Sequence, residues 1–80
     1  MFAMNYVYFL REAHGRLYIG STKNLPKRLT EHNKDKPGFK LLGYVAVETE
    51  QKARDLEKYF KTGSGRAILK KRILTDEALA

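Results

Sequence analysis

No cysteine occurs among the 80 residues of this chain, so no disulfide can hold it in a folded form. A chain of this length has room for one hydrophobic core and buries only about 60% of its unfolded surface, so its stability depends on packing or on a partner. We therefore expect residues 1–80 to form a single domain. The lack of cysteine also excludes thiolate zinc sites and cysteine nucleophiles, and it fits a reducing compartment.

Positive charge dominates the composition. Sixteen Lys and Arg residues oppose nine Asp and Glu residues, which gives a formal net charge of +7. Such an excess favours a polyanionic partner, with nucleic acid ahead of an anionic membrane surface. No apolar run approaches the roughly 20 residues that cross a bilayer, and the chain begins without the features of a signal peptide. We therefore expect a cytoplasmic protein with no membrane partner.

The first half of the chain carries a hairpin pattern followed by a helix pattern. Segments 4–10 and 17–20 are rich in Tyr, Val, Ile and Phe on either side of a polar turn, which indicates a β-hairpin. Asn24 can cap a helix with its side-chain oxygen, and Pro26 suits the first turn, where its missing N–H costs nothing. A first helix is therefore expected from this point to about Asn33.

A third strand and two further helices are expected in the second half. Residues 34–38 form a polar break, and the run 41–47 that follows is typical of a strand. Thr49 suits the N-cap of a second helix, which is expected to stop at Gly63. A strongly basic third helix is expected over 65–74, and the last six residues are expected to fray.

This order, β-β-α-β-α-α, predicts an α+β fold in which a small, three-stranded, mainly antiparallel sheet is flanked by three helices. The first two strands must be antiparallel because a short turn joins them. The connection through the first helix leaves the direction of the third strand open.

Two charged residues lie among apolar ones on the predicted helices. Positions three, four and seven apart share one side of a helix. These sides carry Leu25, Arg28, Leu29 and His32 in the first helix, and Ala53, Leu56, Glu57 and Phe60 in the second. A charge that faces the sheet is costly unless it has a partner or a function. Arg28 and Glu57 are therefore candidate functional residues, although a position at the rim of the face, or a mutual ion pair, would explain them without any function.

A tyrosine pattern connects these residues into one ordered set. The set consists of Tyr6-Val7-Tyr8, then Tyr18-Ile19-Gly20, then Arg28, His32 and Glu57. It resembles the GIY-YIG nuclease superfamily, which is named for the two tripeptides. The first tripeptide departs from that name at two positions but keeps its final tyrosine, and the second is intact. The resemblance extends over about 5–72 and is to the small single-domain bacterial type, similar to the N-terminal nuclease domain of the UvrC excision repair protein.

The resemblance implies a metal-dependent endonuclease that hydrolyses phosphodiester bonds in DNA, in repair, recombination or defence. It implies that Glu57 binds a divalent cation, Mg²⁺ or Mn²⁺. Mg²⁺ favours oxygen ligands and often needs a single protein carboxylate beside waters and phosphate oxygens. Arg28 would stabilise the charge that develops on the phosphoryl oxygens with its planar set of donors. No small-molecule cofactor is expected, and the oligomeric state stays open.

The same resemblance makes Tyr18 the candidate general base, with Tyr8 and His32 close by to bind phosphate or relay a proton. A tyrosine needs neighbouring cations to lose its proton near neutral pH, and Lys23, Arg28 and the metal have the required sign. His32 could be the base outright, or it could only cap the end of its helix. The sequence leaves open which of these three side chains is the general base.

One feature of the superfamily is missing here. Many members carry an asparagine beyond the metal-binding glutamate, but the stretch 69–72 supplies only Leu, Lys and Arg. That role is therefore vacant or taken over by another group. This departure keeps a second function open, a non-catalytic or weakly catalytic nucleic-acid-binding module on the same scaffold. A basic protein-interaction or membrane-surface domain is a more distant third.

Basic side chains and one glycine are the expected contacts with DNA, and RNA is not excluded as a substrate. Gly20 permits a close approach of the backbone to phosphate, and cations contact phosphates without reading sequence. The expected contacts are Gly20, Lys23, Lys27, Lys58, Lys61, Arg66, Lys70 and Lys71. Nothing resembles a base-reading helix or a zinc module, so we expect structure-dependent or weakly selective binding.

Overall fold

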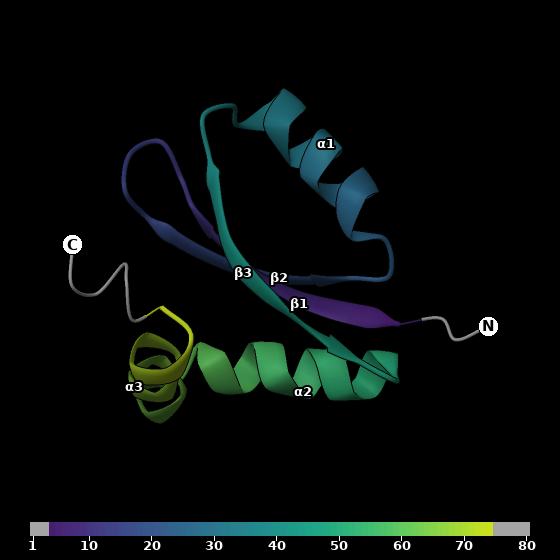
Figure 1. The fold of residues 1–80 in the computed structure, drawn as a ribbon, viewed down its shortest axis with the longest axis vertical. Coiled ribbons are helices and arrows are strands. Elements are labelled where there is room, and N and C mark those ends of the chain that lie inside the picture. The colour runs from purple at the N-terminus through teal and green to yellow at the C-terminus, as the bar shows by residue number, and fades with distance from the viewer. Residues whose placement is uncertain (1–3, 75–80) are drawn as a thin grey trace.

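The computed structural model of the chain, which describes residues 4–74, contains the six predicted elements in the predicted order (Figure 1). They are β1 (Asn5–Arg11), β2 (Leu17–Thr22), α1 (Leu25–Asp35), β3 (Lys40–Val47), α2 (Glu50–Phe60) and α3 (Gly63–Arg72). Residues 75–80, which the sequence predicts to fray, lie outside the described residues. None of the helices within 4–74 has the length and apolar character that crossing a membrane requires.

The three strands form one antiparallel sheet in the order β2-β1-β3. The central strand β1 pairs with β2 so that Tyr8 lies opposite Gly20, and it pairs with β3 so that Tyr8 lies opposite Tyr44. The direction of β3, which the sequence leaves open, is therefore antiparallel to β1. The predicted α+β class and the predicted antiparallel sheet are both confirmed.

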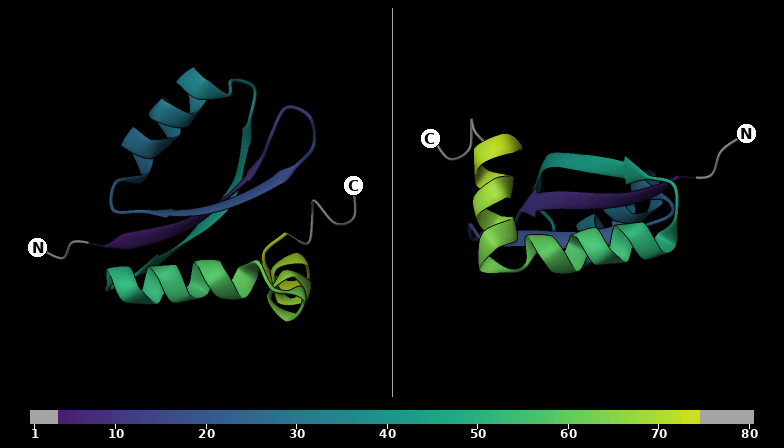
Figure 2. Two further views of the ribbon diagram at one scale, coloured as in Figure 1. Left: turned by 180° about the vertical axis from the view of Figure 1, so that it is seen from behind. Right: turned by 90° about the horizontal axis from the view of Figure 1, so that it is seen from below.

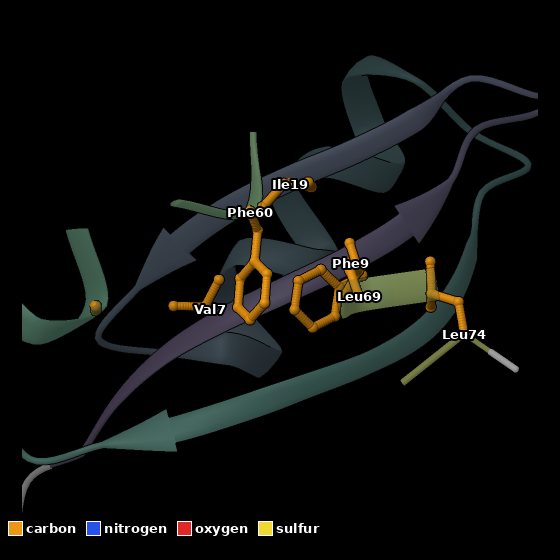
Figure 3. Packing of buried hydrophobic residues seen from close by; sticks show 7 residues of the cluster. Val7, Phe9, Ile19, Phe60, Leu69 and Leu74 are labelled. Carbon is orange, nitrogen blue, oxygen red and sulfur yellow. The ribbon is translucent and has the colours of Figure 1, made fainter. Parts of the chain in front are cut away.

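Helices cover both faces of this sheet, with α1 on one face and α2 and α3 on the other (Figure 1). Neighbouring side chains of a strand point to opposite faces, so β1 supplies two separate clusters. On the α2 face the buried residues are Val7, Phe9, Ile19, Ala53, Phe60, Leu69 and Leu74 (Figure 3). On the α1 face they are Tyr8, Leu10 and Leu25. The central strand thus holds both helical layers in place.

The first two helices begin at the caps that the sequence predicts. Asn24 Oδ1 accepts a hydrogen bond from the backbone N–H of Lys27 at 3.1 Å. Thr49 Oγ1 accepts one from the N–H of Lys52, also at 3.1 Å. These bonds satisfy amide groups that have no partner inside the helix. The helix α1 continues to Asp35, slightly beyond its predicted end.

The junction between α2 and α3 differs from the prediction. Gly63 does not end the second helix, because α2 already ends at Phe60 and Gly63 is the first residue of α3. Thr62 Oγ1 accepts a hydrogen bond from the N–H of Gly65 at 3.0 Å and so caps the third helix. Consequently α3 begins earlier than the predicted 65 and ends at Arg72 instead of 74. It turns across the end of α2 (Figure 2).

Candidate active site

Glu57 is held at the sheet by a hydrogen bond on each of its carboxylate oxygens. Ser21 of β2 donates from Oγ to Oε1 at 2.7 Å, and Lys61 donates from Nζ to Oε2 at 2.8 Å. Burial acts to raise the pKa of Glu57, but the hydrogen bonds from Lys61 and Ser21 and the charges of Lys61 and Arg54 outweigh it. The pKa therefore lies below its usual value, and Glu57 is ionised at neutral pH.

This carboxylate fits the role of a single protein ligand for a hydrated cation. A carboxylate offers about four lone-pair positions, so its two hydrogen bonds leave others available. The Glu57 side chain is 25% exposed, which leaves it accessible from solvent. Within residues 4–74 no three His, Asp or Glu side chains gather into a metal-binding group. The site therefore suits an ion such as Mg²⁺, which keeps several waters and takes its other oxygens from phosphate.

Tyr8 reaches across β2 at Gly20. A Cβ atom at position 20 would lie 2.6 Å from the Tyr8 hydroxyl oxygen and 3.0 Å from Cε1 of Tyr18. Only glycine leaves this space open, so residue 20 allows the Tyr8 hydroxyl to lie over the backbone of the edge strand. Gly20 thus has a packing role, and its predicted approach to phosphate stays a prediction.

The Tyr8 hydroxyl is a proton donor at neutral pH. Burial raises its pKa far above the usual value, and the neighbouring Tyr18 adds to the shift through its charge and through hydrogen bonding. The charge of Arg28 acts in the opposite direction, and that of Glu57 raises the pKa further. Tyr18, Arg28 and Glu57 thus lie near enough to Tyr8 for their charges to act on its hydroxyl. A tyrosine with so high a pKa stays a neutral phenol and can donate a hydrogen bond to phosphate.

His32 lies beside the two tyrosines. Its ring centroid is 5.1 Å from that of Tyr18, which in turn is 6.0 Å from that of Tyr8. The Nε2 atom of His32 is buried and has no hydrogen-bond partner. The carbonyl of His32 accepts the N–H of Lys36, while Nε2 of the imidazole binds no carbonyl. This nitrogen therefore does not cap the helix.

Arg28 and Glu57 form no ion pair with each other. Arg28 is exposed on α1, and its side chain makes no hydrogen bond or ion pair with any other residue of the range 4–74. The sequence left two explanations without a function for these charges. A mutual ion pair is wrong, whereas Arg28 does lie at the exposed rim of its helix face. Its guanidinium is consequently available to bind an anion beside Tyr8.

Two grooves open along the edge strand β2, one at each end of it. The first contains Ser21 and Thr22 and the basic residues Lys23, Lys27, Arg28 and Arg54. The second contains Leu17, Tyr18 and Ile19 and the basic residues Arg16, Lys36, Lys61 and Arg66. Glu57 lies between the grooves, because it accepts hydrogen bonds from Ser21 of the first and Lys61 of the second.

Only some of the basic residues predicted to contact nucleic acid line these two grooves. Four of them line the grooves, namely Lys23, Lys27, Lys61 and Arg66. Three others are exposed but line neither of these two grooves, namely Lys58, Lys70 and Lys71. Sequence reasoning missed Ser21, although it directly follows the intact tripeptide, and it missed the groove residues Arg16 and Arg54.

The structure supplies no amide where the superfamily asparagine is missing. Leu69 is fully buried in the main core, and Lys70, Lys71 and Arg72 are exposed on α3. An apolar side chain that is buried in this way cannot bind a phosphate or a cation. The asparagine's role is not filled from this stretch of α3.

Comparison with known proteins gives one match. A family model described as the GIY-YIG catalytic domain matches residues 4–72. The match includes all six helices and strands of the described residues and every residue of the candidate site. The comparisons with curated proteins and with solved structures gave no match.

Proposed function

This chain belongs to the GIY-YIG catalytic domain family, which implies nuclease activity on a nucleic-acid substrate, and we propose that it is a divalent-metal-dependent endonuclease that hydrolyses phosphodiester bonds in DNA. The observation that carries the proposal is the position of Glu57. Its ionised carboxylate lies between two basic grooves and near the neutral hydroxyl of Tyr8. A phosphate at that point could contact a cation, a guanidinium and a phenol together.

Glu57 holds the divalent cation in this proposal, and Ser21 keeps the carboxylate turned toward the edge of the sheet. When bound, the cation polarises the scissile phosphate and stabilises the departing oxygen. Arg28 binds the non-bridging oxygens with two parallel N–H donors and stabilises the charge that grows on them in the transition state. Both contributions are electrostatic.

The tyrosines and His32 handle the proton of the attacking water. Tyr8 keeps its proton and donates a hydrogen bond to the phosphate, because its pKa is raised by burial. Tyr18 is the proposed general base. His32 contacts Tyr18 and takes the proton that Tyr18 gives up.

Basic residues of the two grooves bind the strand on either side of the scissile phosphate. The grooves continue along the same edge strand, so a backbone that follows it meets cations before and after Glu57. Contacts of this kind neutralise phosphates and carry little sequence information. We therefore propose weakly selective or structure-dependent binding. DNA repair, as for UvrC, is one proposed role, and the proposed location is the cytoplasm.

A second candidate function is a nucleic-acid-binding module with little or no catalysis. Two observations favour it. Leu69 lies in the stretch where many family members have an asparagine, and the ammonium of Lys61 occupies one oxygen of Glu57. A protein that only binds nucleic acid would keep both basic grooves. Its Glu57 could keep the hydrogen bond from Lys61, because no metal ion would have to replace it.

The deciding experiment is incubation of the purified protein with supercoiled, branched and single-stranded DNA, and with RNA, in Mg²⁺, Mn²⁺ or EDTA. Cleavage that needs the metal and favours DNA would support the endonuclease proposal. Tight binding with no products in any metal would support the binding module. Neither binding nor cleavage would contradict both, and preferred cleavage of RNA would correct the substrate.

A further inference from the structure

Glu12 is a buried carboxylate to which the proposed chemistry assigns no role. Its side chain is only 7% exposed. The hairpin fixes its backbone, because the N–H of Glu12 donates to the carbonyl of Arg16 at 2.9 Å and its carbonyl accepts from Gly15 at 2.8 Å. Burying an ionised carboxylate is costly unless it has charged or hydrogen-bonding partners. The partners of Glu12 therefore indicate what it does.

Two cationic or potentially cationic groups face the Glu12 carboxylate. Oε2 lies 3.7 Å from Nζ of Lys36 and 4.0 Å from Nε2 of His32. The Lys36 side chain is 65% exposed, so solvent and salt screen that ion pair. The His32 side chain is 10% exposed, so its interaction with Glu12 takes place away from water and is stronger. The groove beside Glu12 is also lined by the basic residues Arg16, Lys61 and Arg66.

The ring of His32 is held from its other sides by aromatic residues. Tyr18 lies 5.1 Å away between centroids, and Phe39 packs edge-to-face at 5.2 Å. The remaining edge of the ring carries Nε2, which has no hydrogen-bond partner, and this edge faces the carboxylate of Glu12. The separation of 4.0 Å is longer than a hydrogen bond. Such contacts in sites without substrate often shorten when the substrate binds.

We propose that Glu12 is a positioning residue that fixes the Nε2 edge of His32 and stabilises the imidazolium formed when His32 accepts a proton. This rests on the proposed function. The proton leaves the hydroxyl of Tyr18 and binds the ring of His32, and the resulting phenolate then takes one proton from the attacking water. Glu12 gives up no proton, and its negative charge compensates the positive ring.

The first test removes the charge but keeps the shape. We expect Glu12→Gln to lower the single-turnover cleavage rate in Mn²⁺ by about 10- to 100-fold, by analogy with carboxylates that support metal-bound histidines. DNA affinity in Ca²⁺ should stay the same or rise, because a negative charge leaves the groove. The matched control is Glu48→Gln, whose carboxylate is 80% exposed and lies beside Lys52. Equal cleavage by Glu12→Gln and the control would overturn the proposal.

A double-mutant cycle separates positioning from a merely structural role. If Glu12 acts through His32, Glu12→Gln should cause no further loss in a His32→Asn background. An equal fold-loss in both backgrounds would show that Glu12 acts independently and would contradict the proposal. Thermal unfolding identifies variants that fail to fold. Glu12→Asp, which keeps the charge, should then retain more activity than Glu12→Gln, and the reverse order would also contradict the proposal.

A third test does not depend on cleavage. In ¹⁵N-labelled protein bound to DNA in Ca²⁺, where the contact is expected to shorten, we expect the Nε2 proton of His32 to exchange slowly and to resonate downfield, and Glu12→Gln should shift it upfield. An unchanged resonance would overturn the positioning role even if the protein cuts DNA. A shifted resonance in a protein that cuts nothing would instead contradict the proposed function and leave the Glu12–His32 pair established.

Discussion

At the scale of single residues, the chemistry of the candidate site depends on groups that keep opposite protonation states at the same pH. Burial keeps the Tyr8 hydroxyl protonated, because its pKa is raised. Hydrogen bonds from Lys61 and Ser21 and the charges of Lys61 and Arg54 keep Glu57 ionised, because together they lower its pKa despite burial. At neutral pH the Tyr8 hydroxyl is thus a hydrogen-bond donor, and the Glu57 carboxylate is a negatively charged acceptor.

Removal of the Glu57 charge should abolish cleavage without unfolding the protein. Glu57→Gln keeps nearly the same shape and can still accept the hydrogen bond from Ser21, but it loses the charge that attracts the cation. We expect a loss on the order of a thousandfold in cleavage rate, equivalent to several kcal/mol of transition-state stabilisation. Gel-based cleavage, DNA affinity and thermal unfolding measure the three properties. Asp55→Asn on the same helix is the control, and full activity of Glu57→Gln would disprove the metal-ligand assignment.

The Arg28 guanidinium should not be replaceable by an ammonium. Arg28→Lys keeps the positive charge but loses the planar pair of donors, so we expect cleavage to fall by about 100-fold or more. Rates measured at saturating DNA would show whether the loss lies in catalysis. Arg72→Lys, at the exposed end of α3, should behave as the unchanged protein does. A fully active Arg28→Lys variant would instead indicate a general electrostatic role.

At the scale of the elements, the position of Glu57 depends on how α2 is fixed at both ends. Thr49 caps its beginning, and at its other end Gly65 of α3 packs against the backbone of Tyr59. A Cβ atom at Gly65 would overlap the carbonyl oxygen of Tyr59, which is backbone and cannot rotate away. Close contact between the two helices thus requires glycine at this position.

Two glycine substitutions in α3 should therefore have opposite effects. We expect Gly65→Ala to lower the free energy of unfolding by about 1–3 kcal/mol or more, because the helices must separate. Gly63→Ala meets no atom within 4 Å, so we expect it to be neutral or to stabilise the helix by up to about 1 kcal/mol. Urea unfolding of both variants provides the comparison. Equal midpoints would mean that the junction tolerates a side chain at position 65.

At the scale of the whole molecule, the net charge of +7 is distributed unevenly over the surface. Within the first groove, Glu50 pairs with Lys23 at 3.6 Å and with Arg54 at 2.6 Å, which reduces the positive charge there. The second groove is lined by one acid, Glu12, against four basic residues, of which Lys61 also pairs with Glu57. The second groove should therefore contribute strongly to phosphate binding.

Affinity for duplex DNA should fall steeply with salt, because bound cations displace condensed counterions. With about four phosphate contacts, the slope of log K against log salt should be about −3.6. Arg66→Gln in the second groove should flatten the slope by roughly one unit, whereas Lys71→Gln, which lines neither groove, should not. Fluorescence anisotropy with Ca²⁺ in place of Mg²⁺ measures this without turnover. Salt-independent affinity, or no binding at low salt, would mean that nucleic acid is the wrong partner.

The sequence by itself determined the element order, the helix caps at Asn24 and Thr49, and the set of residues typical of the family. These features depend on neighbours a few positions away, since an N-cap bonds to an amide three residues on and a helix face repeats every three or four. The same local reasoning was wrong at Gly63, where two signals competed. A glycine can end a helix, but the Thr62 hydroxyl was available to begin another one.

Only the tertiary structure decided the direction of β3 and the contacts across layers. Ser21 and Glu57 lie 36 positions apart, and their hydrogen bond exists because α2 packs on the face of β2 to which Ser21 points. Glu12 reads as an ordinary turn residue until α1 places His32 against it. Contacts between distant segments depend on how layers pack, and no local pattern contains that information.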